Sequence, residues 1–320
     1  MSLTPEIPIL DVSAVVNGDD AGIDRLADQL GAACRDIGFF YVAGHGLPPV
    51  LVERTFAMSK AFFALPLETK LAVDMRNSPH NRGYMPFEGE TLDPSKPGDL
   101  KETFNLGLEL AADDPEVLAG MPFRGVNQWP DLPGFRAAML DYFDAIWALG
   151  RKLHYAICRD LGLDDMFFDD KLDRPLAILR LLHYPGNSVP KHDEQIGAGA
   201  HTDYGNITLL LPDATPGLEV RTRHGDWIDA PSVPGAFVCN IGDCLMRWTN
   251  DVYVSTPHRV RIPERKRYSI AFFLDPDPDA DVTVLPGCVS DERPARYPPT
   301  TGAAYLKERL DATQAFRRDS

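Results

Sequence analysis

A histidine followed two positions later by an acidic residue is the first pattern in this sequence that could do chemistry. Residues i and i+2 of a β-strand point to the same face, so such a pair can hold one metal ion. Three pairs occur: His192/Glu194, His201/Asp203 and His224/Asp226. Because about one is expected by chance from 8 histidines and 47 acidic residues in 320, the surrounding sequence must decide between them.

The surrounding sequence favours His201 and Asp203. They follow GAGA, a run we expect to be flexible, and precede the apolar strand Ile207–Leu211, so both would lie at the mouth of a rigid strand. The pair at 192 and 194 belongs to a polar loop that contains Pro and Lys, and the pair at 224 and 226 is typical of a hairpin turn. We expect those two pairs to be solvated loop residues.

His258, in the late strand YVSTPHRVRI, is the candidate for a third ligand. Taken alone, a histidine in an apolar strand is more often a core residue. Two imidazoles and one carboxylate on one face leave positions open for other ligands, as in non-haem Fe(II) oxygenases. Zinc accepts the same set of ligands, so the three residues alone leave iron and zinc open.

Arg267 and Ser269 form a second pair spaced for one strand face. The planar fork of arginine matches a carboxylate, and the serine hydroxyl adds a donor. An arginine that points inward from an apolar strand requires a buried anion. The alternative, that Arg267 belongs to an exposed basic hairpin with Arg265 and Lys266, is less favoured because Ser269 shares its register.

Four segments form an ordered set of motifs: HTDYGNITLLL, GDWIDAPSVPGAFVCNIGD, WTNDVYVSTPHRV and RYSIAFFLDP. Two more, IPILDVS and CRDIGFFYVAGHGLP, lie near the N-terminus. The four motifs resemble the isopenicillin N synthase-like iron(II)/2-oxoglutarate-dependent dioxygenases, and the two N-terminal segments resemble that family's N-terminal domain. The resemblance runs from about Ile7 to Pro276. It implies a mainly β, α+β fold in which a double-stranded β-helix, or jelly-roll, core is backed by α-helices.

The resemblance also assigns roles to single residues. It implies Fe(II) bound by His201, Asp203 and His258, and 2-oxoglutarate held through its distal carboxylate by Arg267 and Ser269. Tyr184, in LLHYP, matches a tyrosine that contacts this co-substrate in plant members. Those members carry an asparagine two residues earlier, where this chain has Leu182, so one hydrogen bond to 2-oxoglutarate is in doubt.

The activity implied is oxidation, in the simplest case hydroxylation, of a small organic substrate with O2, which releases succinate and CO2. Alternatives are an oxidase of the same fold that does not use 2-oxoglutarate, as isopenicillin N synthase itself, and an ethylene-forming type. A non-enzymatic jelly-roll binding module is less favoured because the ligand set is intact. We expect residues 81–108 to shape the substrate pocket, with core packing an equal alternative for the aromatics; the candidates are Arg82, Tyr84, Phe87, Phe104 and Leu106.

Helices and strands must position these residues. Apolar periodicity and glycine or proline punctuation predict helices over Ile23–Gly38, Pro49–Phe63, Pro133–Gly162 and Gly302–Ala312. A short strand is predicted at Thr103–Leu108. Short strands split by turns also fill Leu176–Leu274 and predict a jelly roll. We expect a first region, 1–130, that combines helices, strands and a loop-rich pocket segment, and a second, 131–320, with the long helix, the oxygenase core and a C-terminal helix.

The amino-acid composition limits the classes of binding partner that we expect. The net charge of −15 repels phosphate backbones, and the one basic cluster lies within a single expected hairpin, so we expect no nucleic-acid partner. No apolar run is long enough to span a bilayer, and the N-terminus does not resemble a signal peptide. Five scattered cysteines are typical of a reducing compartment, so we expect a cytoplasmic protein with a small-molecule substrate and no membrane partner. The oligomeric state is not predicted.

Overall fold

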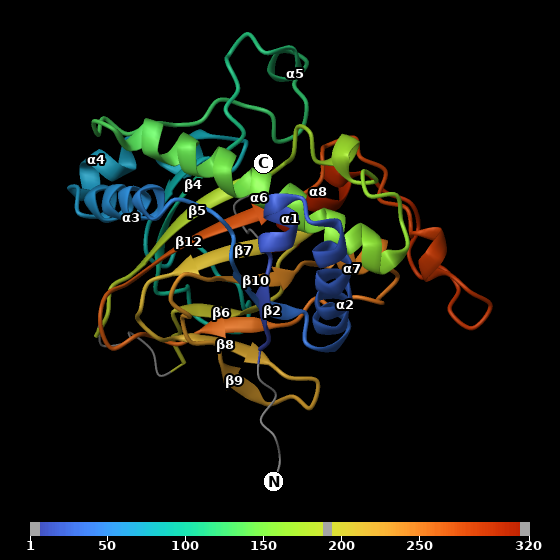
Figure 1. Cartoon of the computed structure of the whole chain (residues 1–320). Helices are drawn as coiled ribbons and strands as arrows, with labels where there is room; N and C mark the ends of the chain where they lie inside the picture. The colour runs from blue at the N-terminus through green and yellow to red at the C-terminus, as the bar shows by residue number, and fades with distance from the viewer. Residues whose placement is uncertain (1–6, 188–193, 314–320) are drawn as a thin grey trace.

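Two antiparallel sheets face each other in the computed structural model, which describes residues 7–187 and 194–313. The larger sheet has the strand order β1-β2-β10-β7-β12-β5-β4-β3, and the smaller has the order β6-β11-β8-β9 (Figure 1). The strands are β1 (Ile9–Asp11), β2 (Phe39–Ala43), β3 (Gly83–Met85), β4 (Glu102–Gly107), β5 (Ile178–Tyr184), β6 (Ala198–His201), β7 (Ile207–Pro212), β8 (Leu218–Arg221), β9 (Trp227–Asp229), β10 (Phe237–Ile241), β11 (His258–Val260) and β12 (Arg267–Leu274). This pair of sheets is the jelly-roll core of an α+β fold.

Strands from the first 130 residues lie at both edges of the larger sheet. On one side β2 pairs antiparallel with β10, and β1 pairs with β2 as the one parallel neighbour among the described strands. On the other side β4 pairs with β5, and β3 pairs with β4. The N-terminal region therefore completes the sheet that the later strands begin.

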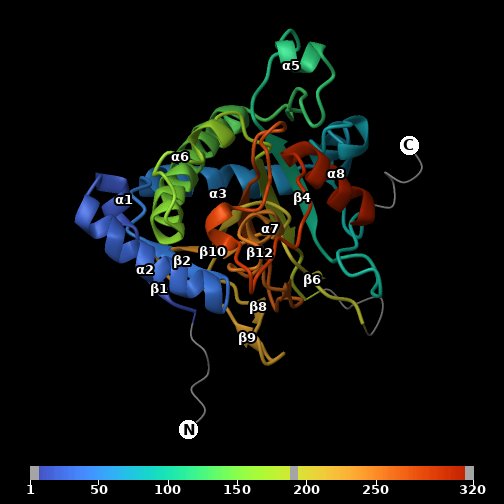
Figure 2. The same cartoon turned by 90° about the vertical axis from the view of Figure 1, so that its right-hand side faces the viewer.

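Helices cover the outer face of the larger sheet. Figure 2 shows α1, α2 and α6 together on one side of the sheets, with α8 on the other side. The helices are α1 (Ser13–Asn17), α2 (Asp20–Asp36), α3 (Pro49–Phe63), α4 (Leu67–Leu71), α5 (Pro115–Leu118), α6 (Phe135–Leu161), α7 (Asp243–Trp248) and α8 (Gly302–Thr313), with short 3₁₀ turns at Met75–Asn77, Asp169–Lys171 and Pro286–Cys288. No helix in the described ranges is long and apolar enough to cross a membrane.

Strand β12 shows how the sheet separates two interiors. Ile270, Phe272 and Leu274 pack with the apolar face of α6 in the helical layer. The alternate residues Arg267, Ser269, Ala271 and Phe273 face the space between the two sheets. This alternation follows from the two-residue period of a strand, and it brings the predicted Arg267/Ser269 pair to one inward face.

Most predicted elements are present. Helix α3 has the predicted bounds. Helix α6 ends before Gly162, whose backbone is in the left-handed conformation (φ 64°). Strands β4 and β5 lie where the sequence predicts strands.

Two local expectations were wrong. The GAGA run is not a flexible segment but includes β6, because its small residues allow the backbone at Asp93 to approach Gly199, whose N–H donates to Asp99. Residues 253–257 of the predicted strand YVSTPHRVRI form a bend and irregular backbone, so that strand begins only at His258.

Candidate active site

The three residues expected to bind metal lie together between the sheets. His201 ends β6 and is the cross-strand partner of His258 in β11, whereas Asp203 lies in the loop leading to β7. Oδ1 of Asp203 is 3.8 Å from Nε2 of His201 and 3.7 Å from Nε2 of His258. Of the residues that the structure describes, these three form the group in which every ligand atom lies within 4.8 Å of the others, a spacing that suits one metal ion.

Hydrogen bonds from neighbouring groups orient all three ligands. Nδ1 of His201 donates to the carbonyl of Gly199 at 2.7 Å, and Nδ1 of His258 donates to that of Thr256 at 3.2 Å. A carbonyl only accepts, so each Nε2 keeps its lone pair for a metal. Oδ2 of Asp203 accepts from Thr208 at 2.6 Å and from Asn240 at 2.8 Å, which leaves Oδ1 facing the histidines.

Electrostatics favours the protonation states that a metal site needs. Burial, with His258 nearby, lowers the pKa of His201, so its imidazole is neutral at neutral pH. Burial alone would raise the pKa of Asp203, but the two histidines and its two hydrogen bonds outweigh burial and lower it. A neutral imidazole and an ionised carboxylate are the forms that coordinate metal ions.

An inner cavity of about 60 Å³ extends from these ligands into the barrel, and Arg267, Ser269 and Tyr184 line it. Nη1 of Arg267 donates to Oγ of Ser269 at 3.3 Å, and its guanidinium lies over the ring of Tyr184, 5.0 Å from the centroid. Arg267 is 1% exposed, its Nε has no hydrogen-bond partner, and it forms no ion pair within the described ranges. A buried cation without an acidic partner fits an anionic ligand, such as the distal carboxylate of 2-oxoglutarate.

Comparison with known families places both halves of the chain. Residues 7–132 match the model of the non-haem dioxygenase in morphine synthesis N-terminal region, and residues 175–276 match that of the 2OG-Fe(II) oxygenase superfamily. The 2-oxoglutarate-Fe(II) type oxidoreductase hxnY of Emericella nidulans is 40% identical, over 98% of this chain and 93% of that protein. The chain belongs to the 2OG-Fe(II) oxygenase superfamily. Its cofactors are therefore Fe(II) and 2-oxoglutarate, which decides between the iron and zinc interpretations.

Other relatives in this superfamily act on or bind different molecules. The homoarginine-6-hydroxylase 2-ODD-C23 of Glycine max is 37% identical over 87% of this chain and 88% of its own length. A full-length Neurospora crassa protein, solved in complex with alpha-KG and thymine, aligns with a TM-score of 0.84 at 35% identity, over 96% of each chain. The fold and the cofactors are thus shared among proteins whose other ligands differ.

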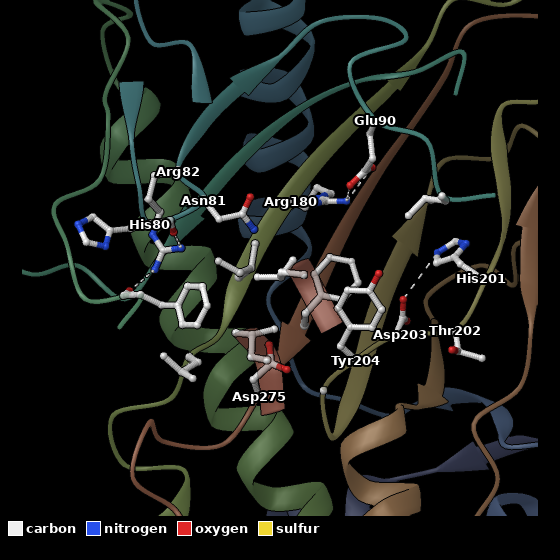
Figure 3. A pocket seen from close by; sticks show the side chains of 18 residues that line it. His80, Asn81, Arg82, Glu90, Arg180, His201, Thr202, Asp203, Tyr204 and Asp275 are labelled. Carbon is white, nitrogen blue, oxygen red and sulfur yellow. Dashed lines mark hydrogen bonds and ion pairs between the residues drawn. The ribbon is translucent and has the colours of Figure 1, made fainter. Parts of the chain in front are cut away.

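Two of the three ligands, His201 and Asp203, also line an outer cavity of about 90 Å³ (Figure 3). It shares Leu92, Arg180, His201, Asp203 and Phe273 with the inner cavity, so the two meet at the metal site. His80, Asn81 and Arg82 stand at the end away from His201 and Asp203. Helix α8 contributes Leu306 and Leu310 to the wall.

Arg180, which lines both cavities, belongs to a group of four charged side chains. Arg180 lies within 3.3 Å of Glu90, and Lys101 contacts Glu90 at 3.1 Å and also pairs with Asp99. Burial would raise the pKa of Glu90, but Arg180 and Lys101 outweigh burial and lower it to about 2. The two cations and two anions neutralise each other, so this cluster supplies fixed polarity without net charge.

Sequence reasoning missed three other residues of the outer cavity. Asn81 has a positive φ of 62°, unusual for a residue with a side chain, and its buried Oδ1 has no hydrogen-bond partner. Burial, followed by repulsion from Asp203, raises the pKa of Asp275 to about 7. Tyr204 directly follows the ligand Asp203. Its position beside the His-x-Asp pattern was the one signal that could have identified any of the three.

Of the five residues expected to line the substrate pocket, the structure places one, Arg82, in a cavity wall. Tyr84, Phe104 and Leu106 pack instead in the helical core, and Phe87 is 37% exposed. For the residues in β3 and β4, the reason is the strand face on which each side chain lies. Thr103 pairs with Leu182 of β5, so Phe104 and Leu106 point to the face that α6 covers.

The two remaining histidine pairs differ from the metal site. His192 lies outside the described residues, and Glu194 forms an ion pair with Lys96 at 3.0 Å. His224 and Asp226 are exposed in the turn between β8 and β9, as the hairpin prediction expects. Of the basic residues that precede Arg267, Arg259 and Arg261 both form ion pairs with Glu219.

Proposed function

We propose that this protein hydroxylates a C–H bond of a small organic molecule, with 2-oxoglutarate and O2 as co-substrates and succinate and CO2 as products. The observation that carries this proposal is the geometry of the inner cavity. Three metal-ligand side chains line it, two of them shared with the outer cavity, and Arg267, a buried cation without an acidic partner, lines its wall. A ligand with a carboxylate at each end would fit between them.

His201, Asp203 and His258 are the proposed Fe(II) ligands. The carbonyls of Gly199 and Thr256 hold the two imidazoles in the tautomer that keeps Nε2 free. Thr208 and Asn240 hold one carboxylate oxygen of Asp203, so the other is aimed at the metal position. Phe39 of β2 packs edge-on against the ring of His258, with centroids 5.4 Å apart, and fixes that ligand from a third side.

Arg267 and Ser269 are proposed to bind the distal carboxylate of 2-oxoglutarate, with Tyr184 beside them. The guanidinium provides charge and direction, and Ser269 adds one hydroxyl. Leu182, the cross-strand partner of Ser269, is apolar and lines the same cavity. The co-substrate therefore depends more heavily on Arg267 here than it would with an asparagine at position 182.

Bound iron and 2-oxoglutarate together supply the power to oxidise a C–H bond. The chain's own residues position the substrate and exclude water from the metal site. Leu92 and Phe273 lie where the two cavities meet and keep water away from the metal site. The outer cavity receives the substrate, so its reacting carbon must lie near His201 and Asp203.

The relatives support hydroxylation of a small, nitrogen-containing molecule as the first activity to test. One group of relatives is named for hydroxylation of homoarginine, and the Neurospora crassa protein has been solved with thymine bound. Both molecules have a place in the first substrate screen.

The decisive experiment is an anaerobic titration of the Fe(II) protein with 2-oxoglutarate. We expect a visible metal-to-ligand charge-transfer band that saturates at one equivalent, and succinate formation when O2 and a substrate are added. Product formation without succinate would indicate an oxidase that does not use 2-oxoglutarate. Ethylene in the headspace would indicate the ethylene-forming type, and absence of the band would reject the proposed cofactor site.

A further inference from the structure

A buried arginine without an acidic partner indicates a position where an anionic ligand binds. Three arginines of the described residues are buried: Arg82, Arg124 and Arg267. Arg124 lies 2.8 Å from Glu116, so its charge is compensated within the protein. Arg267 has no acidic partner and lines the inner cavity, where the proposed function places the carboxylate of 2-oxoglutarate.

Arg82 has the same features as Arg267 but lines the outer cavity. It is 3% exposed, and it donates to two neutral carbonyls, those of His80 at 2.8 Å and Phe123 at 3.5 Å. Its Nε is buried without a hydrogen-bond partner, and it forms no ion pair with any residue in the described ranges. Burial, together with repulsion from Arg124, lowers the pKa of Arg82 to about 9, so the group still carries its charge at neutral pH.

A glycine leaves space for the guanidinium of Arg82. Gly107, the last residue of β4, lies directly against it, and a Cβ at that position would meet Nη2 at 2.0 Å and Cζ at 2.3 Å. Arg180, also in the outer cavity, differs because Glu90 lies within 3.3 Å and neutralises it. A buried charge without such compensation is costly to keep, so the uncompensated one indicates a ligand that is absent from the protein itself.

We propose that Arg82 anchors a carboxylate of the primary substrate. This inference rests on the proposed function and deepens it by naming the substrate class. Arg82 stands at the end of the cavity away from His201 and Asp203 (Figure 3), so the carboxylate and the reacting C–H bond lie at opposite ends of the substrate. Phe123, Leu176 and Ile178 line the wall and favour an apolar body between the two ends.

The test compares acids with their neutral amides. The probes are 4-methylbenzoate with 4-methylbenzamide and hexanoate with hexanamide, titrated calorimetrically into protein loaded with Mn(II) and 2-oxoglutarate, which does not turn over. We expect at least one acid to bind tenfold or more tightly than its amide. This comparison uses the unaltered chain and needs no variant to fold.

Variants then assign the preference to one residue. Arg82→Gln is expected to weaken binding of the acid about 30-fold or more while leaving the amide unchanged, because a buried charge pair loses one partner. Arg82→Lys should bind the acid with an affinity between those of Arg82→Gln and the unaltered protein. The exposed Arg223→Gln should bind it as the unaltered protein does. The affinity for 2-oxoglutarate, measured in parallel, should stay constant in all three and shows that the barrel is folded.

Three results would overturn the inference: no acid binds, amides bind as well as acids, or Arg82→Gln weakens acid and amide equally. None of these would affect the proposed function, because 2-oxoglutarate binding and its charge-transfer band are measured separately. If instead the band is absent in the unaltered protein, the proposed function fails first.

Discussion

The two cavities that meet at the metal site are built in different ways. The inner cavity is lined largely by strands of both sheets, and its polar residues project at fixed two-residue intervals. Much of the outer cavity comes from loops on either side of β3 and from helix α8. Strands, or residues directly next to them, hold the proposed Fe(II) and 2-oxoglutarate ligands, whereas loops and a helix form much of the proposed substrate cavity.

The strongest test of this division is removal of the metal ligands. Alanine at His201, Asp203 or His258 should abolish tight Fe(II) binding, because two ligands do not hold the ion in this geometry. Metal content after gel filtration and the charge-transfer band with 2-oxoglutarate measure it. His224→Ala serves as the matched control, since His224 is exposed in a turn and should bind iron normally. Loss of iron in that control would contradict the assignment.

The next largest effect is expected at the far end of the inner cavity. Arg267→Lys keeps the charge but loses the two-pronged geometry, so 2-oxoglutarate should bind roughly 10- to 1,000-fold more weakly. Ser269→Ala should have a milder effect, about 0.5–2 kcal/mol. Titration of 2-oxoglutarate at fixed Fe(II) gives both numbers, and iron content should not change. An undisturbed 2-oxoglutarate affinity, with weaker binding of a carboxylate substrate, would favour the oxidase alternative.

A smaller effect is expected from the residues behind the ligands. Thr208→Val removes the hydroxyl that holds Oδ2 of Asp203, and such supporting hydrogen bonds are worth about 10-fold or more in metal affinity. Competition with a chelator measures the change. Thr208→Ser keeps the hydroxyl and should restore affinity. A similar loss in both variants would mean that packing at position 208, rather than the hydrogen bond, matters.

The smallest effect on the metal and co-substrate should come from the helical wall of the outer cavity. Leu306 packs with Phe123 and Leu176, so Leu306→Ala should cost about 2–5 kcal/mol of unfolding free energy. Because Leu306 lines only the outer cavity, 2-oxoglutarate affinity should remain within about twofold of the original. Denaturant unfolding and a 2-oxoglutarate titration measure the two quantities. A large loss of co-substrate affinity would show that the cavities are not independent.

The same division explains what could be predicted from the sequence. Arg267 and Ser269 were found because the strand period itself places them on one face. His201 and Asp203 also follow a local pattern, whereas His258 joined them through its strand and the family resemblance. Each of these residues lies in a strand or next to one, where spacing along the chain determines direction.

The outer cavity could not be predicted in the same way. Phe104 and Leu106 lie in a correctly predicted strand, yet the register of β4 with β5 decides which face meets the cavity, and that register is not visible in the sequence. Asn81, Glu90 and Asp275 come from irregular segments, and long-range packing alone brings them together.

The strand order of the larger sheet has a consequence for protein engineering. The oxygenase strands β10, β7, β12 and β5 are flanked on one side by β2 and on the other by β4, both from the first 130 residues. A fragment that kept only the later residues would leave β10 and β5 as edge strands with unpaired backbone N–H and C=O groups. Such edges promote aggregation. The fragment would also lack Phe39, which packs against His258. Chimeras between relatives should therefore exchange the N-terminal region as a unit together with the barrel, since the two segments that resemble separate modules along the chain are interleaved in space.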